Sequence, residues 1–179
     1  MRAAEITGLV VPVPEAEGLL TSVAERHPEA ARGGVPAHVT VLFPFLHPEK
    51  IDDGVLRTLR ELFERHPPMP VRFAECRRRE EFVYLRPEPA DGLRRLTDEA
   101  RRQWPDVIPY EGAYGEVEPH LTVSIRTAED TAARVHEQIG HDLPVSSRLR
   151  EGWLVSCRDE QWTVQERFPF GGSESTVDT

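Results

Sequence analysis

The sequence repeats one four-residue pattern, His, apolar, Thr, Val, at residues 38–41 and again at residues 120–123. Each copy lies in an apolar run that is typical of a β-strand. Successive side chains of a strand point to opposite faces, so the His and the Thr of each copy share one face. These two polar faces hold four groups, His38 and Thr40 in the first copy and His120 and Thr122 in the second.

Two imidazoles and two hydroxyls are the groups needed to hold a phosphate and to move protons on both sides of it. The unperturbed pKa of histidine is about 6.5, so both protonation states exist near neutral pH. We expect one of His38 and His120 to act as a general base and the other as a general acid, although the pattern does not assign the two roles. We expect Thr40 and Thr122 to donate hydrogen bonds to phosphate oxygens. The doubled motif therefore predicts a phosphoesterase.

The chain has 179 residues, of which 39% are apolar and 30% charged. This length fits one domain, and we expect a single two-lobed domain over residues 1–179, with one motif in each lobe and a disordered tail after about residue 172. No window approaches the ~20 apolar residues that cross a membrane. Two distant cysteines imply no disulfide framework, and the first residues lack a secretory pattern. We expect a cytoplasmic monomer with no membrane partner.

The hydrophobic periodicity predicts a mixture of helices and strands. Helices are expected at residues 15–27, 52–65, 90–104 and 127–139, and strands at 5–13, 38–45, 71–77, 81–85, 120–125 and 161–168. Residues 143–157 are expected to form one long strand or two short ones. After each motif strand the order is alike: a helix, a strand that begins Pro-Val, a charged turn and another strand. This order indicates a duplicated strand-helix-strand-strand unit. If a pseudo-two-fold axis relates the halves, the two motif strands meet at the axis.

Three segments carry a resemblance to a known family. Residues 36–45 read PAHVTVLFPF, residues 119–123 read PHLTV and residues 167–172 read RFPFGG. With these segments the chain resembles the two-histidine phosphoesterase superfamily, and within it the 2′-5′ RNA ligase-like proteins, over nearly its whole length. The resemblance implies a bilobal α+β fold, a pseudo-two-fold pair of antiparallel sheets flanked by helices around a central cleft. It also implies metal-independent cleavage of 2′,3′-cyclic or 2′,5′-linked phosphodiesters, with ligation in some members and no cofactor.

Residues that bind the rest of a substrate are harder to name. Tyr110 and Tyr114 lie in a glycine-containing loop just before the second motif, where an aromatic ring can stack on a nucleobase. Ordinary packing within the loop is an equal alternative. Arg126, Arg158 and Arg167 follow or lie in late strands, and each is a weak candidate for a phosphate contact.

Other residues are expected to have structural roles. Phe43 should lie in the core on the face of Val39. The remaining histidines fall in predicted helices or near their ends and should be solvated: His27, His47, His66, His136 and His141. Arginines at 77–79 are surrounded by glutamates, which predicts a solvated hairpin turn.

Two other classes of function remain open. A metallohydrolase is disfavoured because a catalytic zinc takes about three protein ligands, and neither motif offers a second His or a carboxylate two residues further on. A non-catalytic RNA or nucleotide binder with the same fold is disfavoured because both motifs are intact. The net charge of −9 disfavours a non-specific grip on long nucleic acid. We therefore expect a small nucleotide or an RNA terminus as the substrate.

Overall fold

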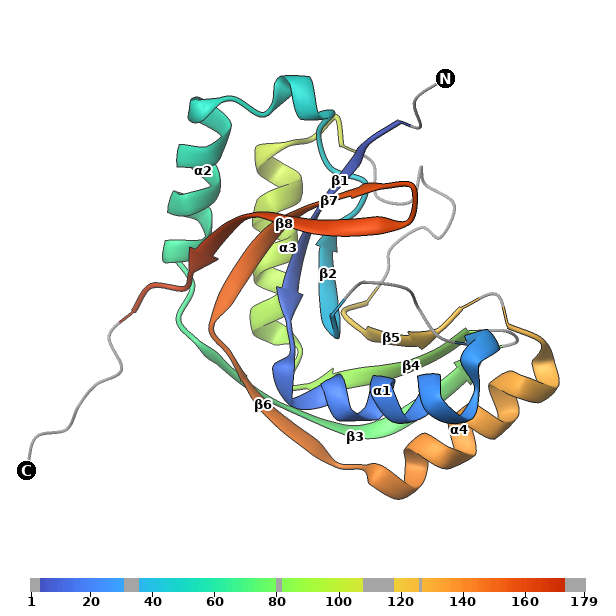
Figure 1. Cartoon of the computed structure of the whole chain (residues 1–179). Coiled ribbons are helices and arrows are strands. Elements are labelled where there is room, and N and C mark those ends of the chain that lie inside the picture. Colours follow the sequence, from blue (N-terminus) through green and yellow to red (C-terminus); the bar gives the residue numbers. More distant parts are fainter. Residues whose placement is uncertain (1–3, 31–35, 80–81, 108–117, 126, 173–179) are drawn as a thin grey trace, which may run out of the picture.

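The computed structural model describes residues 4–30, 36–79, 82–107, 118–125 and 127–172 (Figure 1). Tyr110, Tyr114 and Arg126 lie outside these ranges. The elements are β1 (Ile6–Pro12), α1 (Glu17–Arg26), β2 (His38–Leu42), α2 (Asp53–Glu64), β3 (Met69–Arg79), β4 (Phe82–Glu88), α3 (Asp91–Gln103), β5 (Leu121–Ser124), α4 (Glu129–Asp142), β6 (Val145–Leu149), β7 (Glu151–Arg158) and β8 (Gln161–Pro169). Short 3₁₀ turns occupy Pro14–Ala16, Pro28–Ala30 and Pro48–Lys50.

The eight strands form one sheet in the order β6-β3-β4-β5-β2-β1-β7-β8. Every neighbouring pair is antiparallel, which confirms the α+β class. The two halves that the sequence predicts as a pair of sheets are joined through β2 and β5, the two motif strands, into one continuous sheet. A single residue, Arg150, links β6 at one edge to β7 near the other. Because one residue spans only about 3.8 Å, the sheet must curl until these strands approach each other.

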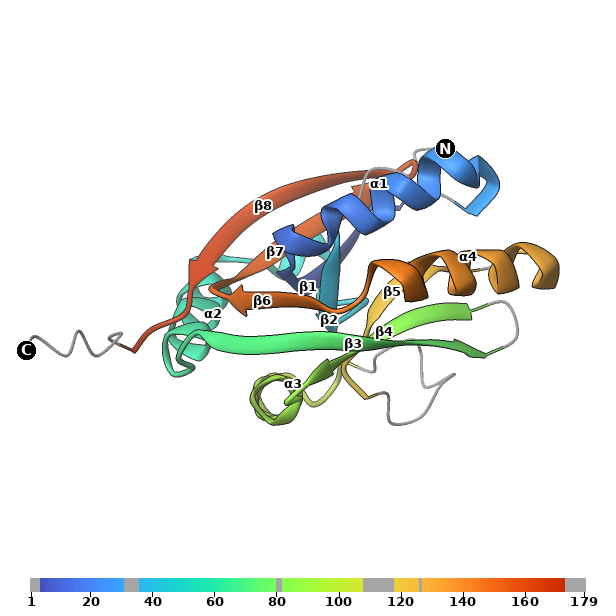
Figure 2. The same ribbon diagram turned by 90° about the horizontal axis from the view of Figure 1, so that it is seen from below.

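The helices are arranged in two matching pairs. Helix α1 precedes the first motif strand and packs on α4, whereas α3 precedes the second motif strand and packs on α2. Helix α3 also contacts β2, α2 contacts β8, and α4 contacts β3 and β4. Figure 2 shows α1 and α4 on one side of the β3 and β4 ribbons and α3 on the other. If the two motif strands exchange places, each helix pair maps onto the other, as a pseudo-two-fold relation requires.

One helix illustrates how sequence, capping and packing combine. Asp52 caps α2 by accepting a hydrogen bond from the Val55 N–H at 2.9 Å, which satisfies one of the unpaired donors of the first turn. Phe63, on the apolar face of this helix, stacks on Phe168 of β8 with ring centroids 5.5 Å apart. A Cβ at Gly152 of β7 would come within 2.2 Å of the Phe63 ring, so only glycine lets the helix approach this closely.

Candidate functional site

The two motif strands are bridged at the apolar residue between the His and the Thr of each motif, Val39 of β2 and Leu121 of β5. Both side chains are almost fully buried in the core, at 1% and 0% exposure. Directly opposed residues of an antiparallel pair project to the same face, and their neighbours along each strand project to the other. The residues that flank this bridge are the four motif groups, so one face of the sheet presents all of them together: His38, Thr40, His120 and Thr122.

The first motif contains a β-bulge directly after its threonine. Thr40 pairs with Val10 of β1, but Leu42 pairs with the adjacent residue Leu9. Val41 is therefore the extra residue, and Leu42 returns to the core with Leu9. A bulge of this kind increases local twist and changes where the following side chains point.

The second motif contains the same bulge at the same position. Thr122 pairs with Tyr84 of β4, but Ser124 pairs with the adjacent residue Val83, which makes Val123 the extra residue. The duplication thus extends beyond the four shared letters to the irregularity that follows them. Two matched bulges beside the two polar pairs support a common origin for the two halves.

Each motif imidazole is held by the main chain just before it. Nδ1 of His38 lies 2.7 Å from the carbonyl oxygen of Pro36, and Nδ1 of His120 lies 2.8 Å from the carbonyl oxygen of Glu118. A carbonyl oxygen only accepts hydrogen bonds, so Nδ1 carries the proton in both rings. In each ring Nε2 is then the nitrogen that gains or loses a proton. We call this hydrogen bond, from Nδ1 to the carbonyl oxygen two residues earlier in the chain, the clamp. It sets the tautomer and orientation of both rings.

The two histidines differ in their surroundings. His38 is buried, with 9% exposure, whereas His120 is more accessible. The His120 ring makes edge contacts with Phe82 and Tyr84 of β4, at centroid distances of 5.4 and 5.7 Å. These two half-buried rings stack on each other at 4.7 Å. His120 therefore lies against an aromatic wall that the sequence analysis missed.

A row of side chains extends outward from Thr122 on the same face. Tyr84 is opposite Thr122, and Arg77 of β3 is opposite Tyr84. Arg77 is exposed and donates to Glu75 at 3.0 Å. The arginines at 77–79 lie in strand β3, so the prediction that they form a hairpin turn is wrong. The sequence did contain a signal for the aromatic wall beside His120. Phe82 and Tyr84 alternate with buried residues, which places both rings on the polar face of the strand.

A second row extends outward from Thr40. Val10 is opposite Thr40, Trp153 of β7 is opposite Val10, and Arg167 of β8 is opposite Trp153. The Arg167 guanidinium lies over the Trp153 ring, 4.9 Å from its centroid, and the Trp153 ring nitrogen donates to Glu151 at 2.8 Å. Both rows thus end in an aromatic ring and an arginine on the site face, and Val10 separates Thr40 from the aromatic ring of its row. Arg158 instead forms a 2.8 Å ion pair with Glu5.

The bulge at Val41 also changes the position of Phe43. Its ring packs over Gly8, where a Cβ would come within 2.7 Å of it, and lies 5.6 Å from the ring of Trp162. Phe43 is half-buried rather than in the core beside Val39, so its predicted position is wrong. The prediction assumed regular strand alternation from Val39 to Phe43 and did not include the extra residue of the bulge, Val41.

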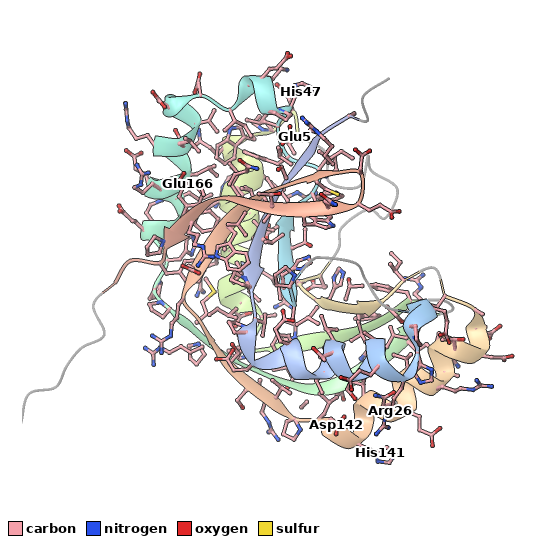
Figure 3. All side chains as sticks on the ribbon, in the orientation of Figure 1. Glu5, Arg26, His47, His141, Asp142 and Glu166 are labelled. Carbon is pink, nitrogen blue, oxygen red and sulfur yellow. The ribbon has the colours of Figure 1, made fainter. Side chains whose placement is uncertain are left out.

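The remaining histidines divide into three groups. His27 is half-buried, with Nδ1 3.9 Å from the Glu29 carboxylate, so it is less solvated than predicted. His47 and His141 are exposed, as expected, and Figure 3 shows them at opposite ends of the molecule. His66 is 5% exposed and its Nε2 lies 3.2 Å from the Glu99 carboxylate, so the prediction of a solvated side chain is wrong there. Nε2 of His136 lies 2.9 Å from the carbonyl oxygen of Cys76. These contacts tie α2 to α3 and α4 to β3, and they are structural.

Within the described ranges, no three His, Cys, Asp or Glu side chains gather into a group that could hold a metal ion. Burial raises the pKa of the Cys76 thiol to about 12, which keeps it protonated and unsuited to nucleophilic attack or metal binding. In the same part of the chain, no helix is both long enough and apolar enough to cross a membrane.

Comparison with known proteins adds independent findings. The model of the 2′-5′ RNA ligase superfamily matches residues 12–161. A predicted phosphoesterase of Geobacillus kaustophilus is 26% identical over 151 residues, which cover 79% of this chain and 82% of the relative. A predicted phosphoesterase of Bacillus licheniformis is 26% identical over 150 residues, covering 76% and 82%.

Solved structures show the same fold. LigT of Escherichia coli, crystallised with 3′-AMP, superposes with a TM-score of 0.64 at 17% identity, covering 94% of this chain and 99% of LigT. The TT0787 protein of Thermus thermophilus superposes with a TM-score of 0.64 at 22% identity, covering 97% and 100%. Other LigT crystals contain phosphate, ATP or NADP⁺.

Proposed function

Because this chain belongs to the 2′-5′ RNA ligase superfamily, we propose that it is a metal-independent phosphodiesterase that opens 2′,3′-cyclic phosphates of nucleotides or RNA ends. The observation that carries the proposal is the doubled clamp, in which each motif histidine is fixed through Nδ1 to the carbonyl two residues before it. A structural strand histidine would have no reason to recur with the same tautomer, the same neighbouring threonine and the same following bulge.

The reaction needs two proton transfers, and the site offers one nitrogen for each. One histidine removes a proton from water through Nε2 as the water oxygen attacks phosphorus. The bond from phosphorus to one ribose oxygen breaks, and the other histidine gives that oxygen a proton. Thr40 and Thr122 donate to the non-bridging oxygens, where negative charge grows in the transition state. The product of attack by water is a phosphomonoester. Attack by a ribose hydroxyl in place of water, through the same two proton transfers, would instead form a phosphodiester and so join two nucleotides.

The site face also offers groups suited to a nucleoside. Tyr84 is half-buried beside Thr122, and base stacking on such a ring contributes about 1–3 kcal/mol. Arg77 and Arg167 bring positive charge to the outer ends of the two rows on an otherwise acidic protein. LigT has been crystallised with 3′-AMP, which supports a nucleotide as the ligand of this fold. Tyr110 and Tyr114 remain proposed base contacts.

The test is hydrolysis of the four nucleoside 2′,3′-cyclic monophosphates, cyclic-phosphate RNA ends and 2′,5′-linked dinucleotides, each with excess chelator. We expect turnover of at least one cyclic phosphate that the chelator does not reduce. Loss of all turnover with chelator, restored by a divalent metal, would indicate a metallohydrolase. Binding of nucleotides without turnover of any substrate would favour the non-catalytic binder.

The salt dependence of catalytic efficiency tests whether the preferred substrate is small or extended. A protein with a net charge of −9 repels an extended polyanion, so catalytic efficiency on a cyclic mononucleotide and on a cyclic-phosphate-ended oligonucleotide should both depend weakly on salt. A steep loss with salt for the oligonucleotide alone would reveal an extended RNA-binding surface and contradict the small-substrate proposal.

A further inference from the structure

The peptide unit between Pro36 and Ala37 is held at both ends. Its carbonyl oxygen accepts from Nδ1 of His38, and its N–H donates to the carboxylate of Glu17 at the start of α1. Ala37 is 1% exposed, and its own carbonyl accepts from the Val13 N–H at 2.8 Å. A buried N–H that loses its partner is costly, so this peptide has a strong preference for one orientation. Glu17 therefore fixes the plane that fixes the His38 ring.

The equivalent peptide before His120 cannot be held in this way. It joins Glu118 to Pro119, and proline has no N–H to donate. Here the side chain of Glu118 is held instead, by the Nε of Arg94 at 2.6 Å. Arg94 lies in α3, and its Nη1 also donates to Asp91 at 3.1 Å. The hydrogen bond and the charge of Glu118 raise the pKa of Arg94, so the guanidinium stays charged.

We propose that Glu17 and Arg94 are positioning residues for His38 and His120, each acting from the helix that precedes its motif strand. The two anchors differ in chemistry because the two clamping peptides differ: one has an N–H that a carboxylate can hold, and the other has only a side chain. Both keep the clamping carbonyl aimed at Nδ1. The kinetic part of this inference rests on the proposed function, whereas the state of the imidazole rings is observable without any substrate.

The burial of the two anchors predicts unequal effects. Glu17 is half-buried and binds a buried N–H, whereas the side chains of Arg94 and Glu118 are 44% and 62% exposed. Exposed ion pairs hold geometry weakly. We expect Glu17→Ala to lower kcat about ten-fold with little change in KM, since a misaimed reacting group slows the chemical step. Arg94→Ala should lower kcat only about three-fold.

Matched controls separate positioning from general stability. Glu15 lies two residues before Glu17 and also accepts a hydrogen bond, from the Ser147 hydroxyl at 2.6 Å, but it does not contact the motif. Arg60 forms an exposed ion pair with Glu166, comparable in exposure to that of Arg94. Glu15→Ala and Arg60→Ala should leave kcat unchanged. Glu17→Gln keeps an acceptor and should restore most activity, and Glu17→Asp keeps the charge but shortens the reach and should not.

The decisive readout is the tautomer of each ring, measured by two-bond ¹H–¹⁵N NMR of the imidazoles in the full chain. We expect Glu17→Ala, and Glu17→Asp if the alanine variant does not fold, to lower the Nδ1-protonated fraction of His38 and leave His120 unchanged. Arg94→Ala should lower the Nδ1-protonated fraction of His120 and leave His38 unchanged. Unchanged tautomers in folded variants would overturn the inference.

A double-mutant cycle supplies the kinetic arm. Because Glu17 acts through His38, Glu17→Ala should cost nothing further in a His38→Ala background and its full effect in a His120→Ala background. Equal costs in both backgrounds would overturn the positioning role. Should no substrate be turned over at all, the proposed function would fail while the NMR arm still decides this inference.

Discussion

The two motif regions combine the same reacting groups with different supports. His38 is buried, and its clamping peptide is fixed by a carboxylate. His120 is more accessible and lies against two aromatic rings, and the side chain of Glu118, two residues earlier, is held by an exposed arginine. What the two regions share is the backbone: the clamp from two residues before, the central bridge and the bulge after the threonine. The comparison teaches that geometry at the reacting atoms is duplicated while its supports have diverged.

The largest expected effect breaks the pair. His38→Ala and His120→Ala should each lower turnover by about two to four decades, the usual cost of losing a general acid or base. The measurement is kcat/KM on the best cyclic phosphate from the substrate screen. His47→Ala, which removes an exposed histidine far from the motifs, is the control and should change nothing. Near-normal turnover in either motif variant would contradict the interpretation of the two histidines as a pair.

Variants of the two threonines test whether both halves of the protein donate hydrogen bonds to the same phosphate. Thr40→Ala and Thr122→Ala should each lower kcat less than loss of a histidine does, up to about 10²-fold, because one donor to the phosphate remains. The double variant should lose far more than either single variant. If one threonine carries the whole effect, the phosphate is held by one motif alone.

The aromatic rings test the difference between the halves. Tyr84→Ala should raise KM for a nucleotide about ten-fold through lost stacking, and Tyr84→Phe should not. Trp153→Ala should raise KM less. Trp153 lies two strands from Thr40, whereas Tyr84 lies on the strand next to Thr122, and the Trp153 ring is covered by Arg167. Equal KM values for the wild type and Tyr84→Ala would remove Tyr84 from the binding surface.

The smallest expected effect lies away from the site face, at Glu99 of α3. Burial alone would raise the pKa of this carboxyl, but hydrogen bonds and charges from His66 and Arg65 lower it below its ordinary value. A lowered folded-state pKa gives stability that is present above the ordinary pKa and is lost as pH falls through the folded value. Glu99→Gln should therefore cost about 1 kcal/mol or less at pH 5 and almost nothing at pH 2.

Urea unfolding of the wild type and Glu99→Gln over this pH range provides the measurement for Glu99. A stability difference that grows as the pH falls would show that the sign is wrong. Activity at neutral pH should stay unchanged, which separates this structural histidine contact from the two motif clamps.

Much of the fold could be predicted from the sequence because its signals are local. Alternating apolar residues located the motif strands, and the Asp-capped apolar run located α2. The sharing of one face by His38, Thr40, His120 and Thr122 also followed from alternation, given that the strands meet.

The rest depends on contacts between distant residues. A bulge at Val41 arises from pairing with β1, and nothing in the local pattern distinguishes Val41 from a regular strand residue. His66 follows a predicted helix and looks solvated until α3 brings Glu99 to it. Glu17 precedes Ala37, which it holds, by 20 residues, and Arg94 precedes Glu118 by 24. Only the packing of α1 and α3 brings these anchors next to the motif histidines.

The pH dependence of kcat/KM tests the central claim, that the two motifs supply one acid and one base to a single phosphate, most directly. The wild type should give a bell-shaped profile with two limbs near neutral pH. His38→Ala should lose one limb, and His120→Ala should lose the other, with the residual activity of each followed at high enzyme concentration. If both variants lose the same limb, or if either keeps the complete bell, the two histidines are not an acid–base pair.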